Sequence, residues 1–320
     1  MLAVTATSFS ADDPLSGLAV GELAEPAPPE GWARVRVRAA SLNHHDLWSL
    51  RGDGLRPEQL PMVLGCDAAG VTDDGAEVVV HAVVAEAPDG DETNDPHRTL
   101  LSEKHPGTLA EYVCVPRRNL VPKPATLSWE EAACVPTAWL TAYRMLFTQS
   151  GLKPGGRVLV QGAGGGVSTA LIALARAAGY VVYVTSRDGA KRARAVELGA
   201  HAAFESGARL PERVDAVMET VGAATWDHSL KSLEMGGTVV VAGATSGSEP
   251  PADLRRVFFR QLRVVGSTMG TRGELVALLR LLDATGVRPV VDSVRPLADA
   301  REAFARLASG ETFGKLVLTT

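Results

Sequence analysis

The fold of this chain is decided by the stretch Val158-Leu159-Val160-Gln161-Gly162-Ala163-Gly164-Gly165-Gly166-Val167-Ser168. A β-branched run, a glycine cluster and a helix-forming stretch predict a strand, a tight turn and the start of a helix. Glycine accepts the positive φ angles of such a turn and lets backbone N–H groups approach a ligand closely. The helix start adds the positive end of its dipole, so a turn of this kind is typical of a site for the pyrophosphate of a dinucleotide.

The glycine pattern is a variant of the usual dinucleotide fingerprint. Counted as Gly162-x-x-Gly165-x-x, its third position is Ser168, where a glycine normally permits close packing of helix on strand. Serine is small enough for that role and can donate to a phosphate. The predicted pyrophosphate site therefore consists of Gly162, Ala163, Gly164, Gly165, Gly166, Val167 and Ser168. The alternative is a glycine-rich strand–helix corner without a ligand.

The surrounding sequence favours the dinucleotide site over that alternative, because β runs and helical stretches alternate after Arg157. The β runs are Val158–Val160, Val181–Val184, Val214–Val217, Val239–Val241 and Leu262–Val265, with helices expected at Ser168–Ala178 and Ala190–Leu198. This pattern predicts an α/β fold, a doubly wound parallel sheet of the Rossmann type. A capping box of Ser128 and Glu131 opens an earlier helix that continues through Phe147.

The first third of the chain reads as β-rich. Residues Arg34–Arg38 alternate polar and apolar side chains, and Val78–Val80 and Tyr112–Val115 are short β-branched runs. The polar, acidic stretch Ala85–Pro106 predicts a long surface loop. The chain ends in a predicted helix, Ala298–Ala308, and a strand, Lys315–Leu318.

Composition excludes several classes of protein. The 320 residues are 46% hydrophobic and 22% charged, which is ordinary for a globular protein, and the net charge of −5 argues against a nucleic-acid partner. The longest apolar stretch, near Ala170, is interrupted by Arg176 and is too short to span a bilayer. No secretory signal is recognisable, and three scattered cysteines do not form a disulfide framework. We expect a cytoplasmic protein with a small-molecule substrate, no nucleic acid and no membrane.

The second strand of the Rossmann pattern predicts which dinucleotide is bound. An acidic residue usually ends this strand in NAD-binding units and accepts from the ribose 2′-hydroxyl. Here Thr185-Ser186-Arg187 ends the strand, with Lys191 close by, and Asp188 falls inside the turn. A hydroxyl and a guanidinium suit a 2′-phosphate, so Ser186, Arg187 and Lys191 predict NADP(H). The alternative is that Arg187 and Lys191 are only solvated surface residues.

Several segments, in order along the whole chain, resemble the medium-chain dehydrogenase/reductase family. The matching segments are Asn43–Trp48 with Gly52, Leu64–Gly70, Gly107–Tyr112, Leu140–Tyr143, Leu198–Ala200, Gly236–Thr238 and Gly314–Val317. The resemblance implies a GroES-like β domain, residues 1–124 and 268–320, that carries substrate residues. It also implies a Rossmann NADP-binding domain, residues 125–267, and a homodimer or homotetramer joined through that domain.

The same resemblance shows that residues which bind the catalytic zinc ion in related enzymes are missing here. Zinc alcohol dehydrogenases of the family hold zinc at the positions of Asn43, Cys66 and Thr137, and only Cys66 is a good ligand here. The four cysteines of the structural zinc lobe are also missing between Ala82 and Pro106. The sequence therefore resembles the zinc-free branch of quinone oxidoreductases and enone reductases, and we expect no metal.

The resemblance also proposes site residues. Asn43 and His45 are the predicted catalytic residues, Asn43 as a polar group in the cleft and His45 as a proton relay; a turn-stabilising Asn and a surface His are the alternatives. The further predicted cofactor residues are His44, Thr141, Gly243 and Ala244. Asp46 and Asp67 are expected to hold the local fold.

Together these features predict an NADPH-dependent oxidoreductase that reduces quinones or activated C=C bonds of enones. Without a metal, a simple ketone lacks electrophilic help, whereas a conjugated acceptor delocalises the charge that hydride transfer creates. Two alternatives stay open. One is an alcohol or aldehyde dehydrogenase with unconventional metal ligation through Cys66 with His45 or Asp67, and the other is a non-catalytic NADPH-binding protein.

Overall fold

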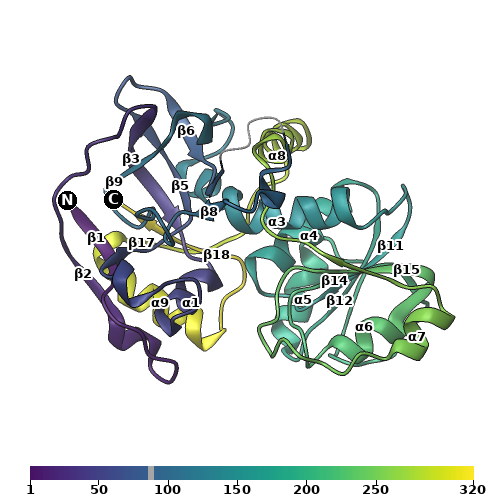
Figure 1. Cartoon of the computed structure of the whole chain (residues 1–320). Coiled ribbons are helices and arrows are strands. Elements are labelled where there is room, and N and C mark those ends of the chain that lie inside the picture. Colours follow the sequence, from purple (N-terminus) through teal and green to yellow (C-terminus); the bar gives the residue numbers. More distant parts are fainter. Residues whose placement is uncertain (86–89) are drawn as a thin grey trace. The chain divides into compact units, whose positions relative to one another are not determined.

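The computed structural model describes residues 1–85 and 90–320, which form two compact units (Figure 1). One unit combines Met1–Leu140 with Gly270–Thr320, and the other is Thr141–Met269. The first boundary lies later than the expected residue 124, because helix α2 (Trp129–Ala133) packs on strands of the first unit. The second boundary lies at Met269 where 267 was expected.

A seven-stranded sheet is the frame of the first unit. Its strands follow the order β10-β6-β5-β3-β18-β17, and β9 also pairs with β3. Their bounds are Leu120–Pro122 (β10), Glu77–Val80 (β6), Asp67–Thr72 (β5), Trp32–Ser41 (β3), Lys315–Thr319 (β18), Val291–Pro296 (β17) and Tyr112–Pro116 (β9). The four strands predicted in this part of the chain all lie within these elements. A second sheet contains β2 (Leu18–Glu22), β1 (Leu2–Ala6) and β4 (Met62–Val63).

The core of this unit follows from the alternation along β3. Val35 and Val37 are fully buried, whereas Arg36 and Arg38 are exposed. The buried face packs with Leu50 of α1 (His44–Arg51) and Phe304 of α9 (Ala300–Ser309), among other apolar side chains. The period of two seen in the sequence is therefore the period of burial.

The end of the chain returns to the beginning. Strand β18 pairs antiparallel with β3, so that Val317 faces Ser41, and β5 pairs with β3 so that Asp67 also faces Ser41. In Figure 1 the yellow C-terminal strands accordingly join the purple and blue N-terminal unit. This topology brings the start of β18, the end of β3 and the start of β5 to one place.

The prediction of a surface loop for Ala85–Pro106 is wrong for much of the described part. Strand β8 (Thr99–Leu100) pairs with β7 (Val83–Val84), a helical turn covers Glu92–Asn94, and Leu101 is fully buried. The polar composition hid these elements because each is only two or three residues long. Residues 86–89 of the predicted loop lie outside the described part of the chain.

The second unit contains the predicted doubly wound sheet. Its six strands are all parallel in the order β13-β12-β11-β14-β15-β16, which is the 3-2-1-4-5-6 order of the Rossmann fold. The bounds are Ala202–Phe204 (β13), Val181–Thr185 (β12), Arg157–Gln161 (β11), Val214–Glu219 (β14), Leu233–Val241 (β15) and Arg263–Gly266 (β16). The strand order reverses between β11 and β14, and ligands of such sheets bind beyond the strand ends at this reversal.

Helices connect these strands. Helix α4 (Gly166–Ala177) packs against β11 and β12, α5 (Gly189–Glu197) follows β12, and α6 (Trp226–Ser232) packs against β14 and β15. The two predicted helices correspond to α4 and α5, whereas α6 was not predicted. The helix predicted to run through Phe147 is α2 followed by π-helical and α-helical turns up to Gln149. No helix of the described ranges is long and apolar enough to cross a membrane.

Candidate functional site

The glycine turn has the geometry that phosphate binding requires. Gly162, directly after β11, has a φ of +82°, and α4 begins at Gly166. A Cβ added to Gly162 would lie 3.6 Å from the Ser168 hydroxyl, and one added to Gly165 would lie 3.9 Å from it. The Ser168 side chain, in the first turn of α4, therefore lies close to both glycines. The first turn of α4 leaves backbone N–H groups free of helical partners, the usual setting for an anion.

A buried chain of polar side chains lies beneath the strand ends of the second unit. Thr185, the last residue of β12, donates to Gln161 Oε1 at 2.5 Å, and Gln161 Nε2 donates to the Ser229 hydroxyl at 2.9 Å. Ser229 donates in turn to Glu219 Oε2 at 2.6 Å. The ends of β12, β11 and β14 are thus fixed to one another by hydrogen bonds, which keeps the turn after β11 in register with the loop after β14.

Glu219 also organises the loop on the other side of the strand reversal. Its carboxylate accepts from the N–H groups of Val221 and Gly222, at 2.8 and 3.0 Å, and from the Thr225 hydroxyl. A Cβ added to Gly222 would lie 2.9 Å from the Cα of Ala244, so the loops after β14 and β15 pack tightly. The predicted residues Gly243 and Ala244 therefore lie beside this loop, while Gln161 and Glu219 were not predicted.

The end of β12 presents cations and no free carboxylate. Asp188 caps α5, because its carboxylate accepts from the N–H groups of Ala190 and Lys191. Ser186 is mostly buried and its hydroxyl accepts from the N–H of Asp188, whereas Arg187 is exposed. The guanidinium of Arg192, which the sequence analysis did not choose, donates to the carbonyl oxygens of Ser186 and Arg187.

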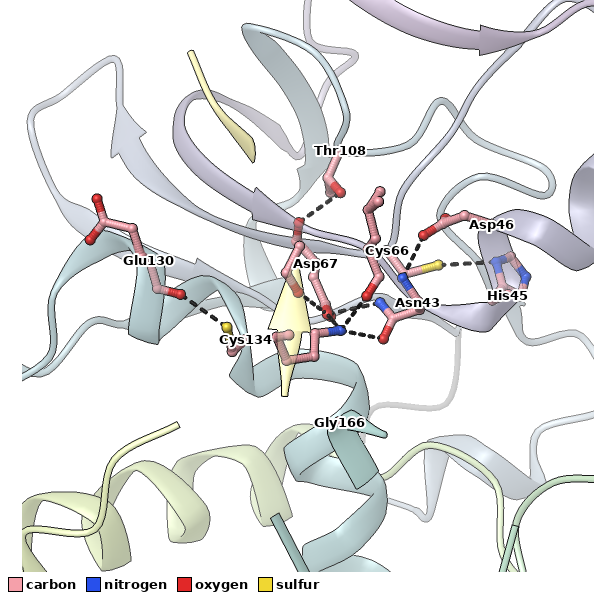
Figure 2. A network of polar contacts seen from close by, with 12 residues as sticks. Asn43, His45, Asp46, Cys66, Asp67, Thr108, Glu130, Cys134 and Gly166 are labelled. Atoms are coloured by element: carbon pink, nitrogen blue, oxygen red, sulfur yellow. Dashed lines mark hydrogen bonds and ion pairs between the residues drawn. The ribbon is translucent and has the colours of Figure 1, made fainter. Parts of the chain in front are cut away.

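The polar centre of the first unit is an ion pair that the sequence analysis missed (Figure 2). The Lys315 ammonium, at the start of β18, is 3% exposed and donates to Asp67 Oδ2 at 3.1 Å and to the Asn43 side-chain oxygen at 2.6 Å. It also donates to the carbonyl oxygen of Leu42 at 2.6 Å. Asp67 Oδ2 accepts further bonds from the Ser41 hydroxyl and the Asn43 amide. The buried positive charge is therefore fully hydrogen-bonded.

This network fixes the orientation of Asn43. An ammonium can only donate, so the Asn43 oxygen faces Lys315 and its NH₂ group faces Asp67. One N–H of that group is used by Asp67, and Asn43 is 9% exposed. Asp67 and Asp46 hold the local structure as expected: Asp46 accepts from the Asn43 N–H at 2.7 Å and closes a capping box at the start of α1. Burial raises the pKa of Asp46 to about 6.

His45 belongs to a second group of side chains in the same unit. Its Nε2 lies 3.0 Å from Glu103 Oε1, and its Nδ1 lies 3.6 Å from Cys66 Sγ. Burial alone would lower the pKa of His45, but the nearby carboxylates of Glu103 and Asp46 favour the imidazolium and raise that pKa. Burial raises the pKa of the Cys66 thiol, which donates to the carbonyl oxygen of Leu101 at 3.2 Å.

The residues at the family's zinc positions do not fit a zinc ion. The Asn43 oxygen already accepts from a buried ammonium, and burial raises the pKa of the Cys66 thiol, which disfavours the thiolate that zinc requires. A Thr137 hydroxyl does not replace a thiolate ligand. Within residues 1–85 and 90–320, no three His, Cys, Asp or Glu side chains come together as a metal site.

The other predicted residues divide between the two units. Thr141 is the first residue of the second unit and is buried, whereas His44 lies in the first unit, exposed on α1 next to Trp48. All three cysteines are free thiols.

Comparison with known proteins identifies the domain family of each unit. Residues 29–125 match the model of the alcohol dehydrogenase GroES-like domain, and residues 166–284 match that of the zinc-binding dehydrogenases. The acryloyl-coenzyme A reductase of Metallosphaera sedula is 31% identical over 95% of this chain and 97% of its own length. The chain belongs to the medium-chain dehydrogenase/reductase family. It is therefore an oxidoreductase with a GroES-like and a Rossmann-like unit, as the resemblance implied.

Solved structures of this family match the whole chain. A structure described as an NAD-dependent alcohol dehydrogenase is 35% identical, with a TM-score of 0.92 and full coverage of both chains. The 2-octenoyl-CoA carboxylase reductase CinF, solved with NADP and 2-octenoyl-CoA, is 26% identical with a TM-score of 0.90, over 99% of this chain and 87% of that one. Family members with this fold thus include both alcohol dehydrogenases and enoyl-CoA reductases.

Proposed function

We propose that this protein is an NADP(H)-dependent reductase of activated C=C bonds that works without a catalytic zinc ion. The observation that carries the proposal is the Lys315–Asn43–Asp67 network at the family's zinc position. A fixed ammonium there disfavours a divalent cation, and its three acceptors leave it no proton for a substrate. The chain then lacks strong electrophilic assistance for a simple carbonyl, but a conjugated acceptor needs less of it.

Reduction of such an acceptor divides the work between cofactor and protein. Hydride leaves the reduced nicotinamide for the β-carbon, and the negative charge moves to the carbonyl oxygen. Asn43, oriented by Lys315, has one N–H beyond the one that Asp67 accepts, and we assign this group to the substrate oxygen. The acryloyl and 2-octenoyl groups named for two relatives are α,β-unsaturated acyl groups and support this class of substrate.

The cofactor assignment rests on the end of β12. The Asp188 carboxylate, the one nearest the strand end, caps α5 and is hydrogen-bonded to the backbone N–H groups of that helix. The neighbouring Arg187 is exposed and follows Ser186 directly in the sequence. Together with Lys191 they suit a 2′-phosphate, and the glycine turn suits the pyrophosphate. The NADP bound by CinF supports this choice, whereas the NAD named for the alcohol dehydrogenase structure favours the opposite one.

The decisive experiment follows NADPH and NADH oxidation with a panel of enoyl thioesters, enones, quinones, ketones and aldehydes. We expect turnover with NADPH and unsaturated acyl or enone substrates, with no gain from added zinc. Turnover confined to alcohols and aldehydes, or stoichiometric zinc in the active protein, would favour the dehydrogenase alternative. Cofactor binding without turnover of any substrate would favour a non-catalytic protein.

Cofactor choice has its own test. Arg187→Ala should weaken NADPH binding about tenfold or more and leave NADH binding within about twofold, because a charge-assisted bond to the 2′-phosphate is lost. Arg209→Ala, which removes another exposed arginine of the same unit, should change neither. An equal loss for both cofactors would contradict the 2′-phosphate assignment.

We further propose that the enzyme is a cytoplasmic homodimer joined through the Rossmann unit. Strand β16 ends the sheet and, among the described residues, pairs only with β15. Val264 on β16 itself is an exposed apolar side chain, and the neighbouring elements of the sequence expose four more: Met235 of β15 and Leu254, Phe258 and Phe259 of α7 (Leu254–Phe259). Val264→Asp should yield monomers by light scattering, whereas Val196→Asp, at an exposed valine of α5, should not. If the natural protein is a tetramer and Val264→Asp yields dimers, this edge forms one of the two interfaces of the tetramer. If Val264→Asp leaves the oligomeric state unchanged, the proposed interface is wrong.

A further inference from the structure

The Glu219 carboxylate, at the end of β14, is fully buried and forms hydrogen bonds but no ion pair. Among the residues that the structure describes, its partners are two backbone N–H groups and the hydroxyls of Thr225 and Ser229, and none of them is a cation. Burial of a charge without a cation costs free energy that hydrogen bonds offset only in part. Such a departure from the usual rule is expected where a residue serves a functional site.

The loop after β14, residues 221–225, uses all of its backbone N–H groups within the protein. Two of them donate to Glu219. The others donate to the carbonyl oxygens of Gly222 and Gly247 and to the Ser246 hydroxyl. A Cβ added to Gly222 would lie 2.4 Å from the carbonyl oxygen of Gly247, so this loop packs closely on the loop after β15. The loop after β14 is therefore a fixed wall beside the strand reversal.

Gln161 connects this carboxylate to the glycine turn, which begins at the next residue. Its Nε2 donates to the Ser229 hydroxyl at 2.9 Å and lies 3.0 Å from His228 Nδ1. His228 Nε2 lies 2.9 Å from the carbonyl oxygen of Ala208, which can only accept, so in the neutral ring Nδ1 accepts from Gln161. Both N–H bonds of the Gln161 amide are thus used, and its orientation is fixed. The Ser229 hydroxyl completes the connection to Glu219 at 2.6 Å.

We propose that Glu219 is a positioning residue of the NADP(H) site. It holds the loop after β14 and, through Ser229 and Gln161, the glycine turn in the arrangement that binds the cofactor. Strands β11 and β14 flank the reversal of strand order, and ligands of such sheets bind beyond the strand ends there. Without the connection, the loops would adopt the binding arrangement for only part of the time, and the Kd would rise by the reciprocal of that fraction. The pyrophosphate that the glycine turn suits is common to NADPH and NADH, so both should lose affinity equally. This inference concerns the cofactor and does not depend on which substrate is reduced.

Glu219→Gln tests the proposal, because it keeps the size of the side chain and replaces one acceptor oxygen by a donor. We expect the Kd of NADPH and the Kd of NADH to rise about tenfold each, while the melting temperature of the cofactor-free protein falls by no more than about 4 °C. Ser229→Ala breaks the link to Gln161 but keeps the bonds of Glu219 to the loop, and it should raise both Kd values at least about threefold.

The matched control is Ser150→Ala, at another buried serine of the same unit, whose hydroxyl donates to the carbonyl oxygen of Leu146. It should lower the melting temperature to a similar extent and leave both Kd values within about twofold. If Glu219→Gln and Ser150→Ala bind both cofactors alike at comparable stability, Glu219 is a purely structural residue and the proposal is wrong. If Glu219→Gln does not fold, the same comparison of Ser229→Ala with Ser150→Ala decides the question.

Hydrogen exchange of the cofactor-free protein provides a readout that does not involve turnover. In Glu219→Gln, the amides of residues 221–225 should exchange at least about tenfold faster, while those of the central strand β11 exchange as in the natural protein. The double variant Gln161→Leu with Ser229→Ala should raise the NADPH Kd no more than the stronger of its two single variants, because both changes break the same connection. Additive effects of the two single variants, or unchanged exchange of the loop in Glu219→Gln, would overturn the proposal.

Discussion

Removal of the Lys315 ammonium should strongly destabilise the first unit. The ammonium is 3% exposed, pairs with a fully buried Asp67 carboxylate and donates three hydrogen bonds. Lys315→Met keeps most of the side-chain volume but leaves the carboxylate buried without its cation. Breaking a buried pair in this way costs about 3–5 kcal/mol, far more than loss of a surface pair.

The measurement is urea unfolding followed by tryptophan fluorescence. Four of the five tryptophans, Trp32, Trp48, Trp129 and Trp139, belong to the first unit, so the signal reports mainly on that unit. The double variant Lys315→Met with Asp67→Asn should recover much of the lost free energy of unfolding, because no unpaired charge remains. Lys231→Met removes an exposed pair with Asp227 and should cost about 0.5 kcal/mol or less. A loss below about 1 kcal/mol for Lys315→Met, or a double variant as unstable as the single one, would refute the reasoning.

Two further predictions concern buried positions of the same unit. Asp46 has a pKa of about 6 in the folded chain against an ordinary 3.8, so the stability gained from its protonation is complete below pH 4 and is lost as pH rises through 6. In urea titrations, the free energy of unfolding of Asp46→Asn should therefore rise by about 1–3 kcal/mol relative to the natural chain between pH 4 and 7.5. A constant difference between the two proteins over this pH range would contradict the prediction. A Cβ added to Gly70 of β5 would lie 2.2 Å from the carbonyl oxygen of Arg36, so Gly70→Ala should destabilise the protein by about 1–3 kcal/mol or more. The control is Gly21→Ala in β2, where nothing lies within 4 Å of the added Cβ. Equal melting temperatures for the two variants would argue against the clash.

The sequence alone contained the local signals of the fold. Alternation of polar and apolar residues along Arg34–Arg38 predicted a half-buried strand, and the glycine turn between a β run and a helix predicted the dinucleotide unit. Both signals lie in residues that are neighbours in the sequence, because the period of a strand and the residue types of a turn depend on local geometry. The short elements between Glu92 and Leu101 escaped prediction since two-residue strands have no period to read.

Site residues were predictable only where a local motif contained them. The proposed site residues Asn43, His45, Ser186 and Arg187 all stand in such motifs, and their roles remain predictions. Gln161 and Glu219 each end a β-branched run, and a polar residue at that place was a signal that could have been used. Glu103 had no comparable signal, because it lies in a charged segment where a carboxylate is unremarkable.

The sequence by itself thus determined the two kinds of unit, the parallel sheet with its glycine turn, and the absence of a good zinc ligand set at Asn43, Cys66 and Thr137. Tertiary structure decided what stands in place of that set. Strand β18 pairs with β3, and β3 pairs with β5, so Lys315 meets Asp67 across 248 positions of sequence. No local pattern encodes that meeting, because the contact depends on how the end of the chain returns to the first sheet and on the burial that makes an unpaired charge there costly.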